Sequence, residues 1–278
     1  MKFKLGCQLD YDISSDSTFI FNIRAIENEY QHILHQSLEI EPNYKLEEHR
    51  DRHFPNSYFR LNVPQGKLKL DYQAEVELTH HVDKIDEIIE TPPASLPLNV
   101  VPYLYPSRYC QSDRLMKLAQ DEFASCSPGY ARVRAICDWI YQKVDYISGS
   151  SDSHTSAYDT ATQRAGVCRD FAHLGIAFCR ALSIPARFVS AYAWQLDPPD
   201  FHACFEAYLG DNWYLFDATR LAPTNGLVRI GTGRDAADTA FATVFGAVQL
   251  NNMDVYIENL DEQSTSEADR TAYANVST

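Results

Sequence analysis

The strongest restriction on the fold of this chain is an alternation of apolar and polar residues that recurs through its first ninety positions. Every second residue is apolar over positions 3–13 and 68–78, which is typical of strands with one buried face. The turn signal "PQGK" joins the later strand to "YFRLNV" as a hairpin, and shorter alternations over 19–23 and 34–40 indicate further strands. Because no helical pattern separates these strands, residues 1–90 are predicted to form an antiparallel β-sandwich.

The composition changes after this segment. Residues 91–110 are predicted to be an extended connector, because "TPPASLPLNVVPYLYPS" holds five prolines, and proline suits neither a helix interior nor a central strand. Helical periods follow: Ser112 is placed to start one helix, and Pro128 precedes a second in "GYARVRAICDWIYQKV". The whole chain is therefore predicted to be an α+β protein, with a mixed core over 111–262 and a loosely held polar tail over 263–278.

The charge and the cysteine pattern argue against several functions. A formal net charge of −14 disfavours a nucleic-acid partner, because phosphate binding needs clustered Lys and Arg. No stretch approaches the ~20 apolar residues of a membrane helix, and the start "MKFKLGCQLDYDIS" lacks the apolar run of a signal peptide. The seven cysteines are scattered without a CxxC pair, unlike a disulfide framework or a zinc ribbon. We therefore expect a cytoplasmic protein with no nucleic-acid and no membrane partner.

A helix that begins with a cysteine is predicted within "GVCRDFAHLGIAFCRALSIP". It runs from about Cys168 to Leu182 and ends before Pro185. Apolar residues on most of its faces place this helix in the core. At its N-terminus, free N–H groups and the helix dipole favour an anion, which would favour a reactive thiolate and could also receive an oxyanion. The alternative is that Cys168 is an inert buried cysteine.

A β-hairpin is predicted in "FHACFEAYLGDNWYLFDATR", with a two-residue turn at "GD". This turn pairs Leu209 with Asn212 and sets His202 opposite Thr219. Asp217 then lies on the same face as His202, diagonal to it and within reach of a side-chain hydrogen bond. The other face of the hairpin is apolar and is expected to face the core.

These residues have the chemistry of a catalytic triad. His202 would take the proton of Cys168 and later pass it to a leaving amine, while Asp217 would hold the imidazole in the right tautomer. Taken singly, a strand histidine is more often a satisfied polar residue, and an aspartate near a strand end more often bonds a turn. A zinc site built from Cys168, His202 and Cys204 is disfavoured, because it would leave Asp217 without a task.

Other polar residues near these segments are expected to have structural roles. Asp170 is expected to support the helix N-terminus electrostatically, His173 to pack or bond locally, and Glu206 to be part of a structural pair. A second donor to an oxyanion is not identified, and Gln163 and Tyr146 are candidates because they are polar and upstream.

The two segments quoted above resemble the transglutaminase-like superfamily, with its papain-like core, over residues 155–222. The strand-rich N-terminal part resembles the β domain that precedes this core in bacterial transglutaminase-like cysteine proteases. The resemblance implies that Cys168 is the nucleophile, His202 the base and Asp217 the third member of a triad. The chain departs from the family at Cys204, where an aromatic residue often follows the histidine by two positions, so the cleft wall is expected to differ.

The expected function is a thiol-dependent hydrolysis of a peptide or isopeptide bond through a thioester. One alternative is a transglutaminase that passes the acyl group to an amine, and the other is a binding or scaffolding protein that keeps the fold without catalysis. The expected partner is a peptide or protein substrate. No cofactor and no resident metal are expected, and the oligomeric state is left open.

Overall fold

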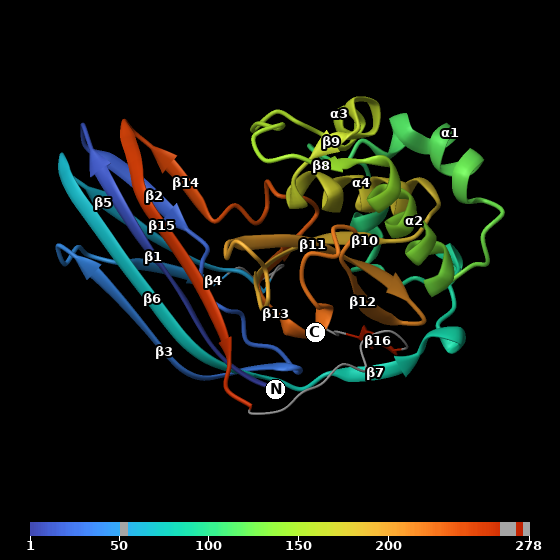
Figure 1. The fold of residues 1–278 in the computed structure, drawn as a ribbon, viewed down its shortest axis with the longest axis horizontal. Helices are drawn as coiled ribbons and strands as arrows, with labels where there is room; N and C mark the ends of the chain where they lie inside the picture. The colour runs from blue at the N-terminus through green and yellow to red at the C-terminus, as the bar shows by residue number, and fades with distance from the viewer. Residues whose placement is uncertain (51–54, 262–270, 275–278) are drawn as a thin grey trace.

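The computed structural model describes residues 1–50, 55–261 and 271–274. Figure 1 shows two lobes, which we call the sandwich lobe and the mixed lobe. The sandwich lobe consists of two four-stranded antiparallel sheets. The first has the order β15 (Val248–Asn259), β1 (Lys2–Ile13), β6 (Gly66–Leu78) and β3 (Gln31–Glu41). The second has the order β14 (Ala242–Phe245), β2 (Ser17–Phe21), β5 (Ser57–Val63) and β4 (Glu47–Arg50).

In these strands the apolar residues of the alternating sequence pattern are buried. β1 pairs with β6 along its whole length, from Lys2 opposite Glu77 to Ile13 opposite Gly66. Apolar residues at every second position of β6 are buried, and they meet a partner sheet in which the Phe19 and Phe21 rings stack 5.5 Å apart. The prediction of an antiparallel β domain at the N-terminus is therefore confirmed.

Two strands depart from the predicted division of the chain. Residues 242–259 fall within the segment 111–262 assigned to the core, but β14 pairs with β2 and β15 pairs with β1. They complete the sandwich lobe instead, because each supplies an antiparallel partner to a strand that would otherwise be a bare edge. The connector over 91–110 contains two 3₁₀ turns, Pro93–Ser95 and Val101–Leu104. Its boundaries stay predictions.

The mixed lobe packs helices on a six-stranded sheet (Figure 1). The strand order of the sheet is β13 (Leu227–Gly233), β10 (Ala186–Ala193), β11 (Phe201–Leu209), β12 (Asn212–Phe216), β16 (Thr271–Ala274) and β7 (His81–Lys84). The α-helices are α1 (Ser112–Phe123), α2 (Tyr130–Lys143), α3 (Ala157–Gln163) and α4 (Cys168–Ala181). A short parallel pair joins β8 (Asp145–Tyr146) to β9 (Ala165–Gly166), and further 3₁₀ turns lie at Ile85–Glu87 and Thr224–Gly226. Most of the predicted tail, 263–278, lies outside the described residues, and 271–274 form β16.

Helix α4 is the central element of the mixed lobe. It begins at Cys168, as predicted, and ends at Ala181, with Leu182 as its C-cap. All its residues from Asp170 onward are buried. The helix lies close to β11, because a Cβ atom on Gly175 would stand 2.5 Å from the Phe205 ring. This close approach sets the start of α4 beside the start of β11. Among the described residues, no helix is long and apolar enough to cross a membrane.

Candidate active site

Cys168 is the first residue of α4 and is partly exposed. The turn into the helix is held by Asp170, whose carboxylate accepts a hydrogen bond from the backbone N–H of Val167 at 2.9 Å. A side chain on Gly166 would collide with Asp170, since its Cβ would lie 2.7 Å from that of Asp170. Asp170 therefore has the supporting role that was predicted for it. Because Cys168 is the first residue of α4, its backbone N–H has no partner within the helix.

His202 and Asp217 meet on one face of the hairpin formed by β11 and β12. The register pairs Leu209 with Asn212, as predicted from the "GD" turn, but the pairing ends with Phe205 opposite Phe216. The predicted pairing of His202 with Thr219 is therefore wrong, because β12 ends at Phe216 and Asp217 lies just beyond it. The Nε2–H of His202 donates a hydrogen bond of 2.8 Å to Oδ2 of Asp217, and both side chains are almost fully buried. The other carboxylate oxygen, Oδ1, accepts bonds from the backbone N–H and the hydroxyl of Thr219 at 2.8 and 2.7 Å. The carboxylate is thereby held against the imidazole.

The second ring nitrogen of His202 is available to Cys168. Nε2 is engaged with Asp217, and Nδ1 has no aligned hydrogen bond to any described residue. Burial lowers the pKa of His202, but the charge and hydrogen bond of Asp217, together with the adjacent Cys168, outweigh it and raise the pKa to about 10. The structure thus brings the three predicted residues together, with the imidazole between thiol and carboxylate.

Tyr146, at the end of β8, also reaches Cys168. β8 pairs with β9 just before α4, which carries the Tyr146 hydroxyl to the thiol and to the backbone N–H of Cys168. Burial and then the neighbouring thiol raise the pKa of Tyr146 to about 12, so its hydroxyl keeps its proton near neutral pH. Gln163, the other candidate for an oxyanion donor, is exposed at the end of α3.

A buried charge network lies on the face of β11 that carries His202. Glu206 is fully buried and accepts hydrogen bonds from Arg187 at 2.6 Å and from Arg229 at 2.8 Å. Burial opposes the charge of this carboxyl, but the two arginines hold the pKa of Glu206 below its ordinary value. Between Glu206 and His202 lies Cys204, whose pKa is raised well above the ordinary value by burial. Glu206 is therefore structural, in agreement with the prediction.

His173 has a packing role. It is fully buried in α4, its ring stacks on Tyr109 with centroids 4.9 Å apart, and its Nε2 accepts a hydrogen bond from the backbone N–H of Ala236 at 3.1 Å. Burial and then the neighbouring arginines lower the pKa of His173 well below its ordinary value. Among the described residues, no group of three His, Cys, Asp or Glu side chains is arranged to hold a metal ion.

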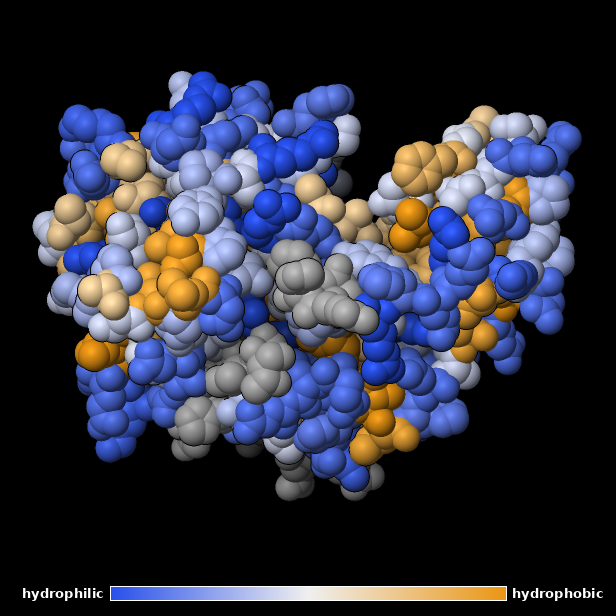
Figure 2. All heavy atoms as spheres, turned by 180° about the vertical axis from the view of Figure 1, so that it is seen from behind, coloured by the Kyte–Doolittle hydropathy of each residue, from blue (hydrophilic) through white to orange (hydrophobic). Residues whose placement is uncertain are grey.

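A pocket of about 460 Å³ opens beside the thiol. Cys168 and His202 both line it, and so do Phe241 and Ala242 from the sandwich side. Figure 2 shows the surface hollowed between the two lobes. The contribution of Phe241 and Ala242 to the pocket was not predicted from the sequence. The alternation "FATVF" over 241–245 is a strand signal, but it carries no information on which distant segment the strand will lie beside.

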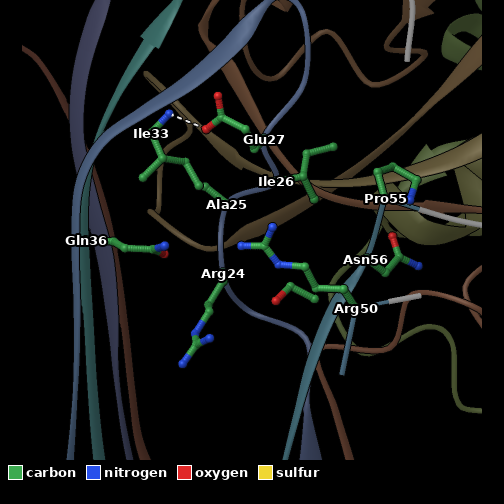
Figure 3. Close-up of a pocket in the computed structure, with 10 residues that line it drawn as sticks. Arg24, Ala25, Ile26, Glu27, Ile33, Gln36, Arg50, Pro55 and Asn56 are labelled. Carbon is green, nitrogen blue, oxygen red and sulfur yellow. Dashed lines mark hydrogen bonds between the residues drawn. The ribbon is translucent and has the colours of Figure 1, made fainter. Parts of the chain in front are cut away.

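A second pocket, of about 140 Å³, lies in the sandwich lobe and shares no lining residue with the pocket at Cys168. Figure 3 shows Gln36 of β3 and Arg50 of β4 pointing toward one another across it. Arg24, at its edge, is paired with Glu48 at 2.7 Å and lies over the Phe59 ring. This pocket is therefore separate from the candidate site.

Comparison with known protein families gives two matches along the chain. The model of the transglutaminase-like superfamily matches residues 117–218, a range that contains Cys168, His202 and Asp217. The model of the bacterial transglutaminase N-terminal domain matches residues 1–97, which cover most of the sandwich strands. Both matches agree with the resemblance drawn from the sequence.

Among solved structures, the crystal structure of a "putative cysteine protease" from Cytophaga hutchinsonii is similar over nearly the whole chain. The two proteins are 49% identical, with a TM-score of 0.93, and the match covers 99% of this chain and 96% of that one. An uncharacterized protein of Mycobacterium leprae is 29% identical over 212 residues, covering 72% of this chain and 76% of that protein. An uncharacterized protein of Mycobacterium bovis is 30% identical over 142 residues, covering 46% and 45%. The predicted fold class is confirmed by the family model and by the similar crystal structure.

Proposed function

We propose that this chain, which belongs to the transglutaminase-like superfamily, is a thiol hydrolase of peptide or isopeptide bonds with Cys168, His202 and Asp217 as its triad. The observation that carries the proposal is the 2.8 Å bond between Nε2 of His202 and Asp217. It leaves Nδ1 as the nitrogen that serves the partly exposed thiol of Cys168. The similar structure designated a "putative cysteine protease" supports hydrolysis as the reaction.

The first half of the reaction forms a thioester. Nδ1 of His202 takes the proton of the Cys168 thiol, and the sulfur attacks the carbonyl carbon of the substrate. A C–S bond forms and the carbonyl oxygen becomes an oxyanion. When this intermediate collapses, the C–N bond breaks and Nδ1 returns its proton to the leaving amine. Asp217 stabilises the imidazolium throughout and holds the tautomer in which Nε2 carries a proton.

The second half consumes water. Nδ1 takes a proton from a water molecule as its oxygen attacks the thioester carbon. The C–S bond then breaks, the acid product leaves, and Nδ1 returns its proton to the sulfur, which restores the thiol of Cys168 and the neutral imidazole. If an amine replaces water at this step, the same thioester gives acyl transfer, which is the alternative of a transglutaminase. The third candidate, a scaffold without catalysis, would use none of these steps.

The oxyanion needs donors that are in place before the reaction. The backbone N–H of Cys168, at the N-terminus of α4, is one proposed donor. The hydroxyl of Tyr146 is the second, because it already lies against that N–H and the thiol. A tyrosine hydroxyl is protonated near neutral pH, which a donor requires.

The decisive experiment incubates the protein with a glutamine-containing peptide library, with and without a primary amine. Chain cuts would indicate a peptidase, ammonia release an amidase, and mass gain by the amine a transglutaminase. Cys168→Ala should abolish every such activity, whereas Cys126→Ala, which removes another partly exposed free thiol, should retain it. Activity that survives in Cys168→Ala would refute the mechanism.

The proposed setting is the cytoplasm, with a peptide or protein as the partner and no role for nucleic acid or membrane. All seven cysteines are free thiols in the structure, which suits a reducing compartment. Fractionation of cells that express a tagged full-length chain would test the location.

A further inference from the structure

The geometry points to a substrate class: we propose that the pocket beside Cys168 binds an apolar side chain of an extended peptide, aromatic or long aliphatic, and that residues 239–242 select it. This inference rests on the proposed function, because it assumes that a peptide carbonyl meets the thiol. It also gives the sandwich lobe a role in the reaction, since one wall of the pocket leads directly into β14.

The pocket is built mainly from aromatic rings and alanines. Its rings belong to Tyr109, Phe188, Phe201 and Phe241, and the last two stack with centroids 4.2 Å apart and planes 19° from parallel. The alanines on its walls, such as Ala240, leave open the space of about 460 Å³. An apolar group that enters this space is removed from water on several sides, which is the main source of affinity in pockets of this kind.

The charges at this pocket do not favour an ionic ligand. Arg169 lines it, but the guanidinium is paired with Asp170 at 3.3 Å and donates to the carbonyl of Asp152. The polar groups of Tyr109 and Ser153 bond one another, hydroxyl to carbonyl, at 2.8 Å. The hydroxyl of Thr239 lines the pocket without a hydrogen-bond partner, but it is neutral, and the imidazole of His202 is already paired with Asp217. A charged side chain would therefore lose its hydration here without gaining a free countercharge.

A further pocket, which is lined in part by Asp217, has a different character. It is lined by Asp217 and by charged side chains that include Arg134, Asp138 and Arg220, and neither Cys168 nor His202 is among its lining residues. A side chain bound there would not be adjacent to the attacking sulfur. Of these two pockets, the pocket beside Cys168 is therefore the one that can bind the side chain of a residue next to the bond being cleaved.

The segment that contains residues 239–242 is held in place by contacts with both lobes. On the mixed side, the N–H of Ala236 donates to His173 at 3.1 Å, and Asp235 accepts from the N–H of Tyr109 at 2.9 Å. On the sandwich side, Ala242 pairs with Phe21 of β2. Because the segment is anchored at both ends, the pocket exists before a substrate arrives, and a preformed pocket discriminates by fit.

The test uses peptidyl chloromethyl ketones, which alkylate an active-site thiol without requiring a known substrate. One series varies the residue that carries the ketone and a second varies the residue before it, each among Phe, Leu, Asp and Lys. In one of the two series, Phe or Leu should label Cys168 about tenfold faster, or more, than Asp or Lys. Equal rates for all side chains in both series would overturn the inference and leave the proposed function standing. No labelling by any of these ketones, while iodoacetamide still reacts, would overturn both.

Two alanines of the same loop give a matched pair of variants. Ala240 lines the pocket, whereas Ala237 is exposed and does not. Ala240→Asp should reverse the preference, so that the Lys ketone becomes faster than the Phe ketone, and Ala237→Asp should keep the order of the wild type. The melting temperature of each variant checks that the fold is retained. A folded Ala240→Asp protein with an unchanged order would contradict the inference.

Discussion

The Nε2 atom of His202 lies 2.8 Å from Oδ2 of Asp217, and the two side chains are 1% and 2% exposed. A charge pair shielded in this way is little screened by salt or solvent. It therefore couples the protonation of the imidazole to the stability of the fold as well as to the proposed chemistry.

Asp217→Asn should flatten the dependence of stability on alkaline pH. The pKa of His202 is raised to about 10 from an ordinary 6.5, so the folded state binds the proton more tightly than the unfolded state. The stabilisation is fully present below pH 6.5 and is lost as the pH rises toward 10. Urea unfolding at intervals from pH 6 to pH 10 should show this loss in the wild type and little of it in the variant. Asp138→Asn, which breaks an exposed pair with Arg220, should keep the slope of the wild type.

His202→Ala should slow the alkylation of Cys168 by iodoacetamide about tenfold at pH 7. The imidazolium beside the sulfur favours the reactive thiolate, and the variant loses that charge. Labelled peptide can be counted by mass spectrometry after short exposures. His154→Ala, which removes an exposed imidazole, serves as control. Equal alkylation rates in the wild type and His202→Ala would favour the alternative that the protein is a scaffold without catalysis.

Tyr146→Phe should lower kcat on the order of 10²-fold with little change in KM, because an oxyanion donor acts only on the transition state. Reaction of Cys168 with iodoacetamide should persist, since the thiolate and His202 remain. Tyr141→Phe changes an exposed tyrosine of α2 and should have wild-type kinetics. A rise in KM at constant kcat would assign Tyr146 to substrate binding instead.

Glu206→Gln should cost about 3–5 kcal/mol of unfolding free energy at pH 7, because it removes the carboxylate with which both buried arginines, Arg187 and Arg229, are paired. Chemical denaturation measures the change. Glu48→Gln removes an ion pair with Arg24 whose carboxylate is half exposed, and should cost less than about 1 kcal/mol. If Glu206→Gln also lost less than about 1 kcal/mol, the buried charge network would not be needed for stability.

Much of the candidate site could be predicted because its signals are local. The start of α4 at Cys168 follows from a glycine turn and an apolar helical stripe, and the hairpin register follows from a two-residue turn. Two features could not be predicted: which ring nitrogen of His202 faces Cys168, and the position of Tyr146. Both depend on how α4, β8 and β11 pack against one another. Both upstream candidates are exposed, and only the structure shows that Tyr146 lies beside Cys168.

The sequence by itself determined the elements: strands where the period is two, helices where it lengthens, and a cysteine at a helix start, because these patterns depend on neighbours within a few residues. Only the tertiary structure decided that β14 and β15 return to the sandwich lobe and bring Phe241 and Ala242 to the pocket at Cys168. The backbone N–H and C=O groups at the edge of a strand can pair with many other strands. Which strand it pairs with depends on how much apolar surface the complete sheets bury, and a short segment of sequence does not contain that information.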